Sequence, residues 1–195
     1  MPTTFTLDTN CIIAVDEGRP EAAFINELVL AHNEGIASVG LVAMSASERQ
    51  QDGRYIRNIE EFNQRLKRLG LDSLKVLMPM AYSDITFMNN SLSCDYAMHV
   101  REKSFHDVLF PSIAFVGSDY CVANGLEPNT AHVDRKWRNA KCDVQAFWTH
   151  AHNRRDVFVT SDKNFHTQTK KAALLALAGG RIETPETAVA LLGSQ

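Results

Sequence analysis

Short apolar runs alternate with amphipathic stretches along this chain. The apolar runs are rich in β-branched or small residues and are bounded by turn-forming residues, so they predict strands at 5–7, 36–43, 74–78, 156–160 and 181–183. Between them, apolar residues recur at helical spacing, which predicts helices at 20–30, from 45, at 56–69, 95–109, 144–151 and 170–178, and from 184. Strands that alternate with helices favour an α/β fold with a mostly parallel sheet.

The stretch at 80–140 has a weaker pattern. Apart from the predicted helix at 95–109, Gly and Asn residues interrupt its periodicity, mainly around 117–130. With 195 residues, of which 45% are apolar and 22% charged, the chain lies in the size range of one domain with a proper core. We therefore expect a single domain over residues 1–195, with an elaboration at about 80–140.

The net charge and the cysteines argue against several classes of protein. A net charge of -3 argues against nucleic-acid binding through overall charge, although it allows a local basic surface beside an acidic centre. The 4 cysteines form no C-x-x-C pair, so neither a zinc knuckle nor a disulfide framework is expected. No stretch approaches about 20 apolar residues and no signal-peptide pattern is present, so we expect a cytoplasmic protein without a membrane partner.

Four acidic residues stand where predicted strands end or a helix begins. Asp8 follows the first strand and Asp162 follows the fourth, while Glu48 comes after the second strand and Asp143 heads the predicted helix at 144–151. Side chains at the carboxyl ends of parallel strands converge on one crevice. Two carboxylates about 4 Å apart repel by about 4 kcal/mol at an effective dielectric constant of about 20. Such a cluster calls for a divalent cation, and oxygen ligands suit Mg²⁺ or Mn²⁺.

Each of these residues also has a structural interpretation. Asp8 can start a turn, and Asp162 can cap the helix that follows it. Glu48 stands at the fourth position of a capping-box pattern, and Asp143 stands where a helix cap would stand. Asn10, two positions after the first Asp, can support the carboxylate of that residue if it is a ligand.

Basic and aromatic residues alternate in one segment. Arg135, Lys136 and Arg138 flank Trp137, which is the arrangement that a surface for single-stranded nucleic acid needs. Lys163, next to Asp162, can hold a phosphate near the acidic residues. A solvated loop is the structural alternative for the segment around Trp137.

The chain resembles the PIN-domain metal-dependent ribonucleases, whose small members include the VapC-type toxins. The resemblance rests on the strand that ends in Asp8-Thr9-Asn10, on Glu48, on Asp143, and on the strand and motif at 157–165. A closing strand, a Thr-Pro pair and a final helix at 181–186 and beyond match as well. These segments cover about the first 50 and the last 55 residues of the chain, and the stretch between Leu74 and Lys141 looks like an insertion.

The resemblance implies a three-layer fold, in which a mostly parallel sheet of four to five strands is flanked by helices. It implies that Asp8, Glu48, Asp143 and Asp162 bind one or two Mg²⁺ or Mn²⁺ ions and that the protein hydrolyses RNA phosphodiester bonds. Thr160, just before the last motif, joins Asn10 as a residue that supports these carboxylates. A toxin with an antitoxin-like protein partner, and a homodimer, are further expectations that the resemblance raises.

Two other functions remain open. A PIN-like module could bind RNA or a protein partner without cleaving anything. A haloacid-dehalogenase-like phosphatase also has an Asp after its first strand, but its chemistry needs a second Asp two residues later, where this chain has Asn10.

Overall fold

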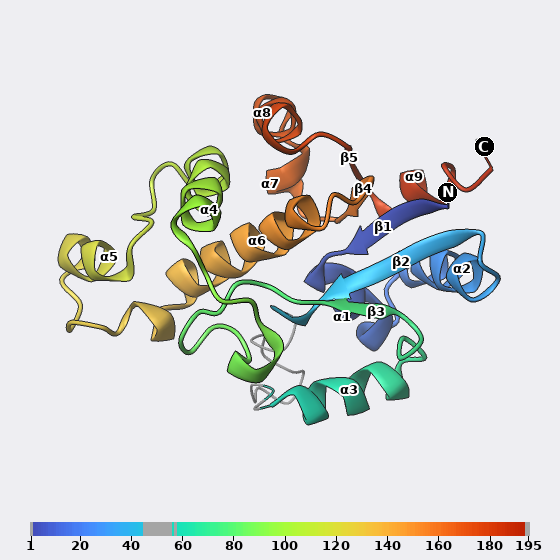
Figure 1. Ribbon diagram of the computed structural model, residues 1–195, viewed down its shortest axis with the longest axis horizontal. Helices are drawn as coiled ribbons and strands as arrows, with labels where there is room; N and C mark the ends of the chain where they lie inside the picture. Colours follow the sequence, from blue (N-terminus) through green and yellow to red (C-terminus); the bar gives the residue numbers. More distant parts are fainter. Residues whose placement is uncertain (1, 45–55, 57, 194–195) are drawn as a thin grey trace.

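The centre of the computed structural model is a five-stranded sheet with the strand order β3-β2-β1-β4-β5 (Figure 1). The structure describes residues 2–44, 56 and 58–193. All neighbouring strands are parallel, and Leu7 at the end of β1 aligns with Leu41 in β2 and Val159 in β4. The strands are β1 (Thr3–Leu7), β2 (Ala37–Val42), β3 (Lys75–Leu77), β4 (Val157–Val159) and β5 (Arg181–Glu183).

Helices cover both faces of the sheet. Phe5 and Leu7 of β1 pack into one core with α1 (Thr9–Glu17), α2 (Ala22–Asn33), α3 (Ile59–Arg68) and α9 (Pro185–Val189). Phe158 of β4 points to the other face and packs with α4 (Tyr96–Leu109), α6 (Arg135–His152) and α8 (Gln168–Ala178). Alternate strand residues thus supply two cores, which confirms the three-layer α/β architecture.

The middle of the chain contributes to the second core. Phe105 of α4 meets Phe147 of α6 edge to face, with ring centroids 5.0 Å apart. A third cluster joins Tyr120 of α5 (Gly117–Asn124) and Ala131 of η3 (Ala131–Val133) to Trp137 of α6 and Val42 of β2. The short helices η2 (Met88–Asn90) and α7 (Lys163–His166) complete the described elements. The region at 80–140 therefore packs against α6 and the sheet.

Most of the predicted elements are present. The five predicted strands match β1 to β5, and the predicted helices at 20–30, 56–69, 95–109 and 170–178 match α2, α3, α4 and α8. The predicted helix from 45 lies outside the described residues. Helix α1 was not predicted, because the Asp-Thr-Asn sequence at its start reads as a turn. Helix α6 begins at Arg135, eight residues before the predicted start at Asp143.

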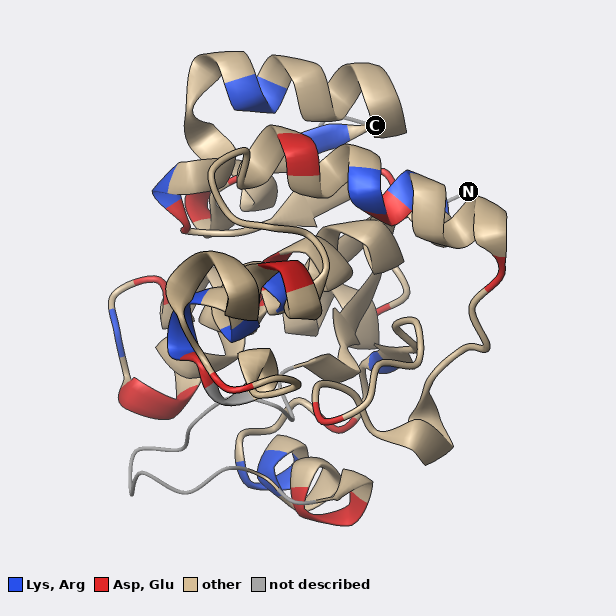
Figure 2. Ribbon diagram, turned by 90° about the vertical axis from the view of Figure 1, so that its left-hand side faces the viewer, with Lys and Arg blue, Asp and Glu red and all other residues tan. Residues whose placement is uncertain are grey.

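Charges of both signs lie next to one another on the surface. Figure 2 shows this on α3, at the bottom of the view, whose first turn carries Glu60 and Glu61 and whose last turn carries Lys67 and Arg68. This order of charges is favourable for a helix, because the dipole of the helix attracts acidic groups to its start and basic groups to its end. Among the helices in the described part of the chain, none combines the length and the apolar character that crossing a membrane requires.

Candidate functional site

A cavity of about 350 Å³ lies at the carboxyl ends of β1 and β4. Its walls come from the start and end of α1, from α6 and from the connection between β4 and α7. The lining residues are Asp8, Thr9, Asn10, Ile13, Arg19, Asn139, Asp143, Ser161 and Asp162. The cavity, called the acidic cavity below, therefore brings together three of the four acidic residues that the sequence indicated. The fourth, Glu48, lies outside the described residues.

Asp8 is fixed by hydrogen bonds to both of its carboxylate oxygens. It caps the start of α1, since its Oδ1 accepts a hydrogen bond of 2.7 Å from the backbone N–H of Thr9. Its Oδ2 accepts hydrogen bonds of 2.7 Å from Asn10 Nδ2 and of 2.7 Å from the Thr160 hydroxyl. The backbone N–H of Asp8 donates to Val159 O at 3.0 Å, which ties the end of β1 to β4. This network holds the carboxylate in one orientation.

Asn10 and Thr160 connect Asp8 with Asp162. Asn10 Nδ2 donates a second hydrogen bond, of 2.8 Å, to Thr160 Oγ1, and Asn10 Oδ1 accepts one of 3.1 Å from the backbone N–H of Ser161. Thr160 Oγ1 also accepts a hydrogen bond of 3.1 Å from the backbone N–H of Asp162. Both residues thus contact the carboxylate that they were expected to support, while their part in function stays a prediction.

Burial changes the acidity of Asp8. The residue is only 3% exposed, and burial raises its pKa from 3.8 to about 6. The nearby charge of Asp162 raises the pKa further, while the hydrogen bonds from Thr160, Thr9 and Asn10 lower it. Near neutral pH the site therefore holds a buried carboxylate whose negative charge is unfavourable. A cation in the acidic cavity would relieve this desolvation and repulsion.

Asp162 caps the helix that follows it, as its structural interpretation predicted, and it also lines the acidic cavity. Its Oδ1 accepts a hydrogen bond of 2.8 Å from the backbone N–H of Asn164, so the residue caps α7. Asp8 combines the same two roles at the start of α1. A capping role and a site role are therefore compatible for both residues.

Asp143 lies inside α6, so its predicted position at a helix start is wrong. The helix begins earlier because Asp134 caps it, accepting hydrogen bonds of 2.9 Å from the N–H of Lys136 and 3.2 Å from the N–H of Trp137. Asp143 and Asn139 are one helical turn apart, share a face of α6 and both line the acidic cavity. The helix interior, and not its cap, thus delivers the third carboxylate.

The donor set fits a hard divalent cation, but it is not assembled around one point. Carboxylate and amide oxygens are the ligands that Mg²⁺ and Mn²⁺ prefer. Within residues 2–44, 56 and 58–193, however, no group of three or more His, Cys, Asp or Glu side chains is arranged so that it could hold a metal ion. The three carboxylates share a cavity without forming a complete set of ligands among these residues.

The predicted nucleic-acid surface around Trp137 needs correction. Trp137 is only 3% exposed, and its indole N–H donates a hydrogen bond of 3.0 Å to Ala114 O. It is neither an open stacking surface nor part of a solvated loop, since it lies in the first turn of α6 and packs into the third cluster. Arg135 and Lys136 in that turn are exposed, as is Lys163 at the start of α7.

Two residues of the acidic cavity were missed at the sequence level. Arg19 follows the left-handed Gly18 at the end of α1, and its guanidinium forms an ion pair of 2.5 Å with Glu17. Asn139 stands one turn before Asp143. The one sequence signal for Asn139 is its i, i+4 spacing from Asp143. This spacing is informative only if residues 139–143 are helical, which the start of α6 at Arg135 establishes.

Comparisons with protein-family models, with curated proteins and with solved structures gave no match. The side chains of the acidic cavity and the sequence motifs therefore provide the grounds for a function.

Proposed function

We propose that this protein is a divalent-metal-dependent endoribonuclease that hydrolyses RNA phosphodiester bonds. The observation that carries the proposal is that Asp8, Asp143 and Asp162, from three distant segments, line one cavity at the carboxyl edge of a parallel sheet. Open α/β sheets bind their ligands at this edge. Such a site could bind several kinds of phosphate ester. We choose RNA as the substrate because the sequence motifs resemble those of the PIN-domain ribonucleases.

The three carboxylates would hold the cation. Asp8 is the central one, because it is buried and because three donors fix its orientation. When bound, Mg²⁺ or Mn²⁺ supplies a water of lowered pKa and neutralises charge on the phosphate. Asn10 and Thr160 keep the Asp8 carboxylate turned in one direction, so that less reorganisation is needed when a substrate binds.

A PIN-like module that binds RNA or a protein without cleaving is the second candidate. It is favoured by one finding, the absence of a group of three metal-binding side chains among the described residues. The phosphatase alternative, the antitoxin-like partner, the homodimer and the cytoplasmic location stay predictions.

The test is cleavage of a labelled, structured RNA pool with Mg²⁺ or Mn²⁺ and with the chelator EDTA. We expect cleavage that EDTA abolishes and that falls by at least about 100-fold in Asp8→Asn, Asp143→Asn, Asp162→Asn and Glu48→Gln. These substitutions remove the charge and keep the shape. Asp72→Asn is the matched control, because Asp72 is exposed and does not line the acidic cavity. RNA binding by an inert, folded wild type would favour the second candidate.

A further inference from the structure

A second cavity, of about 280 Å³, lies in the middle part of the chain. Its walls come from the segment at 82–84, the start of α5, the segment before η3 and the first turn of α6. The residues on which the argument depends are Tyr82, Asp84, Gly117, Asn129 and Trp137. We call it the Tyr82 cavity. It shares no lining residue with the acidic cavity, so it is a separate feature of the surface.

Two aromatic rings form part of its wall. The ring centroids of Tyr82 and Trp137 are 6.0 Å apart, with an angle of 52° between the ring planes. The wall is tightly packed at Gly117, where a Cβ atom would lie 3.1 Å from Ala131 Cβ and 3.4 Å from the Trp137 ring. Burial raises the pKa of Tyr82 to about 12, so its hydroxyl stays protonated well above neutral pH. Because Trp137 is almost completely buried, the ring of the partly exposed Tyr82 is the surface on which a flat ligand can stack.

The backbone around the Tyr82 cavity is unusual. In the described part of the chain, three residues other than glycine have a positive φ, and two of them, Asp84 and Asn129, both at 62°, line this one cavity. Such a conformation is uncommon for a residue with a side chain, and Asp and Asn adopt it more readily than most others because their short side chains can form local hydrogen bonds. The two polar side chains are therefore held at the rim of the aromatic wall by the backbone.

The charges around the Tyr82 cavity do not favour a phosphate as its ligand. None of the described residues that line it is Lys or Arg. The ammonium of Lys141 is 4.5 Å from the centroid of the Tyr82 ring, but it is 1% exposed and paired with Glu102 Oε1 at 2.8 Å. It therefore supports the ring from the core side and is not accessible to a ligand. The lining combines aromatic rings, neutral polar groups, the imidazole of His132 and the carboxylate of Asp84, which suits an uncharged ring with N–H donors.

The location links the Tyr82 cavity to the acidic cavity. Trp137 lines the former and Asp143 lines the latter. The two residues are six positions apart on α6, which corresponds to about 9 Å along the helix axis and about 120° around it. The exposed Arg135 and Lys136 lie in the same first turn as Trp137. Cations at the start of a helix are unfavourable because of the helix dipole, so a nearby phosphate would give them a favourable partner. A strand of RNA that passes this end of α6 would meet both cavities.

From these observations we propose that the Tyr82 cavity binds one base of the RNA strand, and that it prefers bases with an exocyclic amino group over uracil. The reason for the preference is that the Asp84 carboxylate only accepts hydrogen bonds. An exocyclic amino group offers it an N–H at the edge of the base, whereas the single N3–H of uracil lies between two carbonyl oxygens that repel a carboxylate. Enzymes that read an unstacked base combine an aromatic surface with hydrogen bonds to the base edge, which is the combination found here. The role of this base in substrate selection rests on the proposed function.

The test uses the full-length protein without metal and with free nucleosides, so that it does not depend on cleavage. The readout is the indole N–H signal of Trp137 in a ¹H–¹⁵N NMR spectrum, assigned with Trp137→Phe. We expect guanosine, adenosine and cytidine to shift this signal at millimolar or lower concentration, uridine to bind at least about threefold more weakly, and ribose 5-phosphate to have no effect. Asp84→Asn should remove most of the difference between cytidine and uridine.

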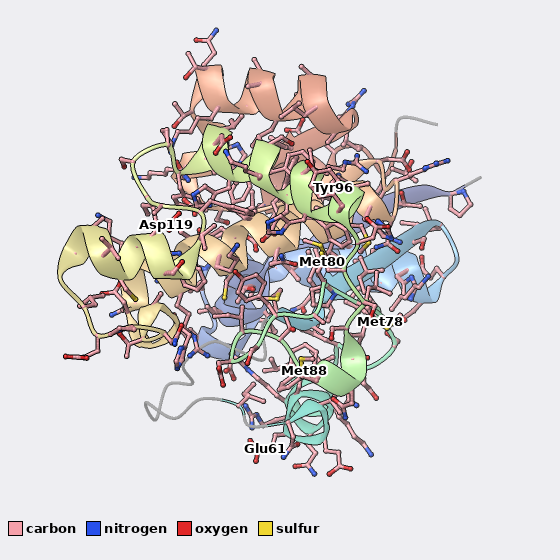
Figure 3. The ribbon with its side chains drawn as sticks, turned by 60° about the vertical axis from the view of Figure 1, so that its left-hand side comes forward. Glu61, Met78, Met80, Met88, Tyr96 and Asp119 are labelled. Atoms are coloured by element: carbon pink, nitrogen blue, oxygen red, sulfur yellow. The ribbon has the colours of Figure 1, made fainter. Side chains whose placement is uncertain are left out.

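A matched pair of variants separates stacking from a general loss of structure. Tyr82→Leu should weaken nucleoside binding by at least about fivefold. Tyr96→Leu should leave it unchanged, because Tyr96 at the start of α4 is 82% exposed and does not line the cavity (Figure 3). Folding of both variants is checked by their unfolding midpoints and by the dispersion of the NMR spectra.

The outcomes distinguish this proposal from the proposed function. A folded wild type whose Trp137 signal does not respond to any nucleoside, or Tyr82→Leu that binds as well as wild type, overturns the base site. Equal binding of ribose 5-phosphate and the nucleosides does so too. Nucleoside binding by a protein that does not cleave RNA keeps the base site and overturns the nuclease. RNA cleavage by a protein that binds no nucleoside supports the nuclease and overturns the base site.

Discussion

The hydroxyl of Thr160 donates a hydrogen bond of 2.7 Å to Oδ2 of Asp8, across 152 positions of the chain. Both residues are buried, and the same hydroxyl oxygen accepts hydrogen bonds from Asn10 Nδ2 and from the N–H of Asp162. One side chain thus joins the ends of β1 and β4 and contacts the groups around two of the acidic residues. Removal of this side chain should therefore change the surroundings of both Asp8 and Asp162.

We expect Thr160→Val to raise the pKa of Asp8 above its value of about 6, because one of the hydrogen bonds that lower this pKa is lost. The free energy of unfolding should fall by about 2 kcal/mol, since a buried hydrogen bond to a carboxyl group disappears while the side-chain shape is kept. Carboxyl ¹³C NMR titration and urea unfolding measure the two effects. The control is Thr169→Val, on the exposed surface of α8. An unchanged Asp8 pKa in the Thr160 variant would contradict this account.

The raised pKa of Asp8 predicts the pH dependence of stability. Between the ordinary pKa of 3.8 and the folded-state pKa of about 6, the folded protein binds a proton that the unfolded chain has lost. Stability from this residue is therefore present below about pH 4 and is lost as the pH rises through about 6, with a total on the order of 3 kcal/mol. We expect the unfolding free energy of wild type, relative to Asp8→Asn, to decline over this range. A rise in this difference over the same pH range would contradict a raised pKa for Asp8 in the folded protein.

Divalent cations should stabilise the folded protein. If Asp8 and Asp162 bind Mg²⁺ or Mn²⁺, an ion concentration of about 100 times the dissociation constant raises the unfolding free energy by about 2.7 kcal/mol. The ion should also lower the pKa of Asp8, because it offsets the burial and the repulsion from Asp162 that raise it. Thermal unfolding at neutral pH with and without EDTA measures the first effect. Asp162→Asn should lose it and Asp72→Asn should keep it; equal stabilisation of both variants would place the ion elsewhere.

A buried ion pair beneath the Tyr82 cavity should contribute strongly to stability. Lys141 Nζ and Glu102 Oε1 are 2.8 Å apart, with both side chains 1% exposed. Burial lowers the pKa of Lys141, and the charge of Glu102 opposes this. We expect Glu102→Gln to destabilise the protein by about 3 kcal/mol in urea unfolding, because a buried cation loses its counter-charge.

The surface offers a matched control for this pair. Lys103 and Asp107 on α4 form an ion pair of 2.6 Å with both side chains more than half exposed. Asp107→Asn should cost less than about 1 kcal/mol, since water screens exposed charges. Similar losses in Glu102→Gln and Asp107→Asn would mean that burial does not set the strength of the inner pair.

The strand-end residues could be predicted from the sequence, and the residues on the long helix could not. Asp8 and Asp162 follow apolar runs whose parallel pairing determines where they lie, so local pattern was sufficient. The start of α6 was missed because its first turn is rich in basic residues and lacks an apolar stripe. The burial of Trp137 depends on contacts with Ala114 and Gly117, which come from another part of the chain. Periodicity within one segment carries no information on such contacts.

The hydrogen bond between Asp8 and Thr160 determines when the site can form during synthesis on the ribosome. Thr160 is synthesised 152 residues after Asp8, and β4 and Asp162 emerge with it. Until then the Asp8 carboxylate lacks one of its hydrogen-bond donors and the acidic cavity lacks one of its walls. The nascent chain therefore completes its site only after the segment at 157–165 has left the exit tunnel.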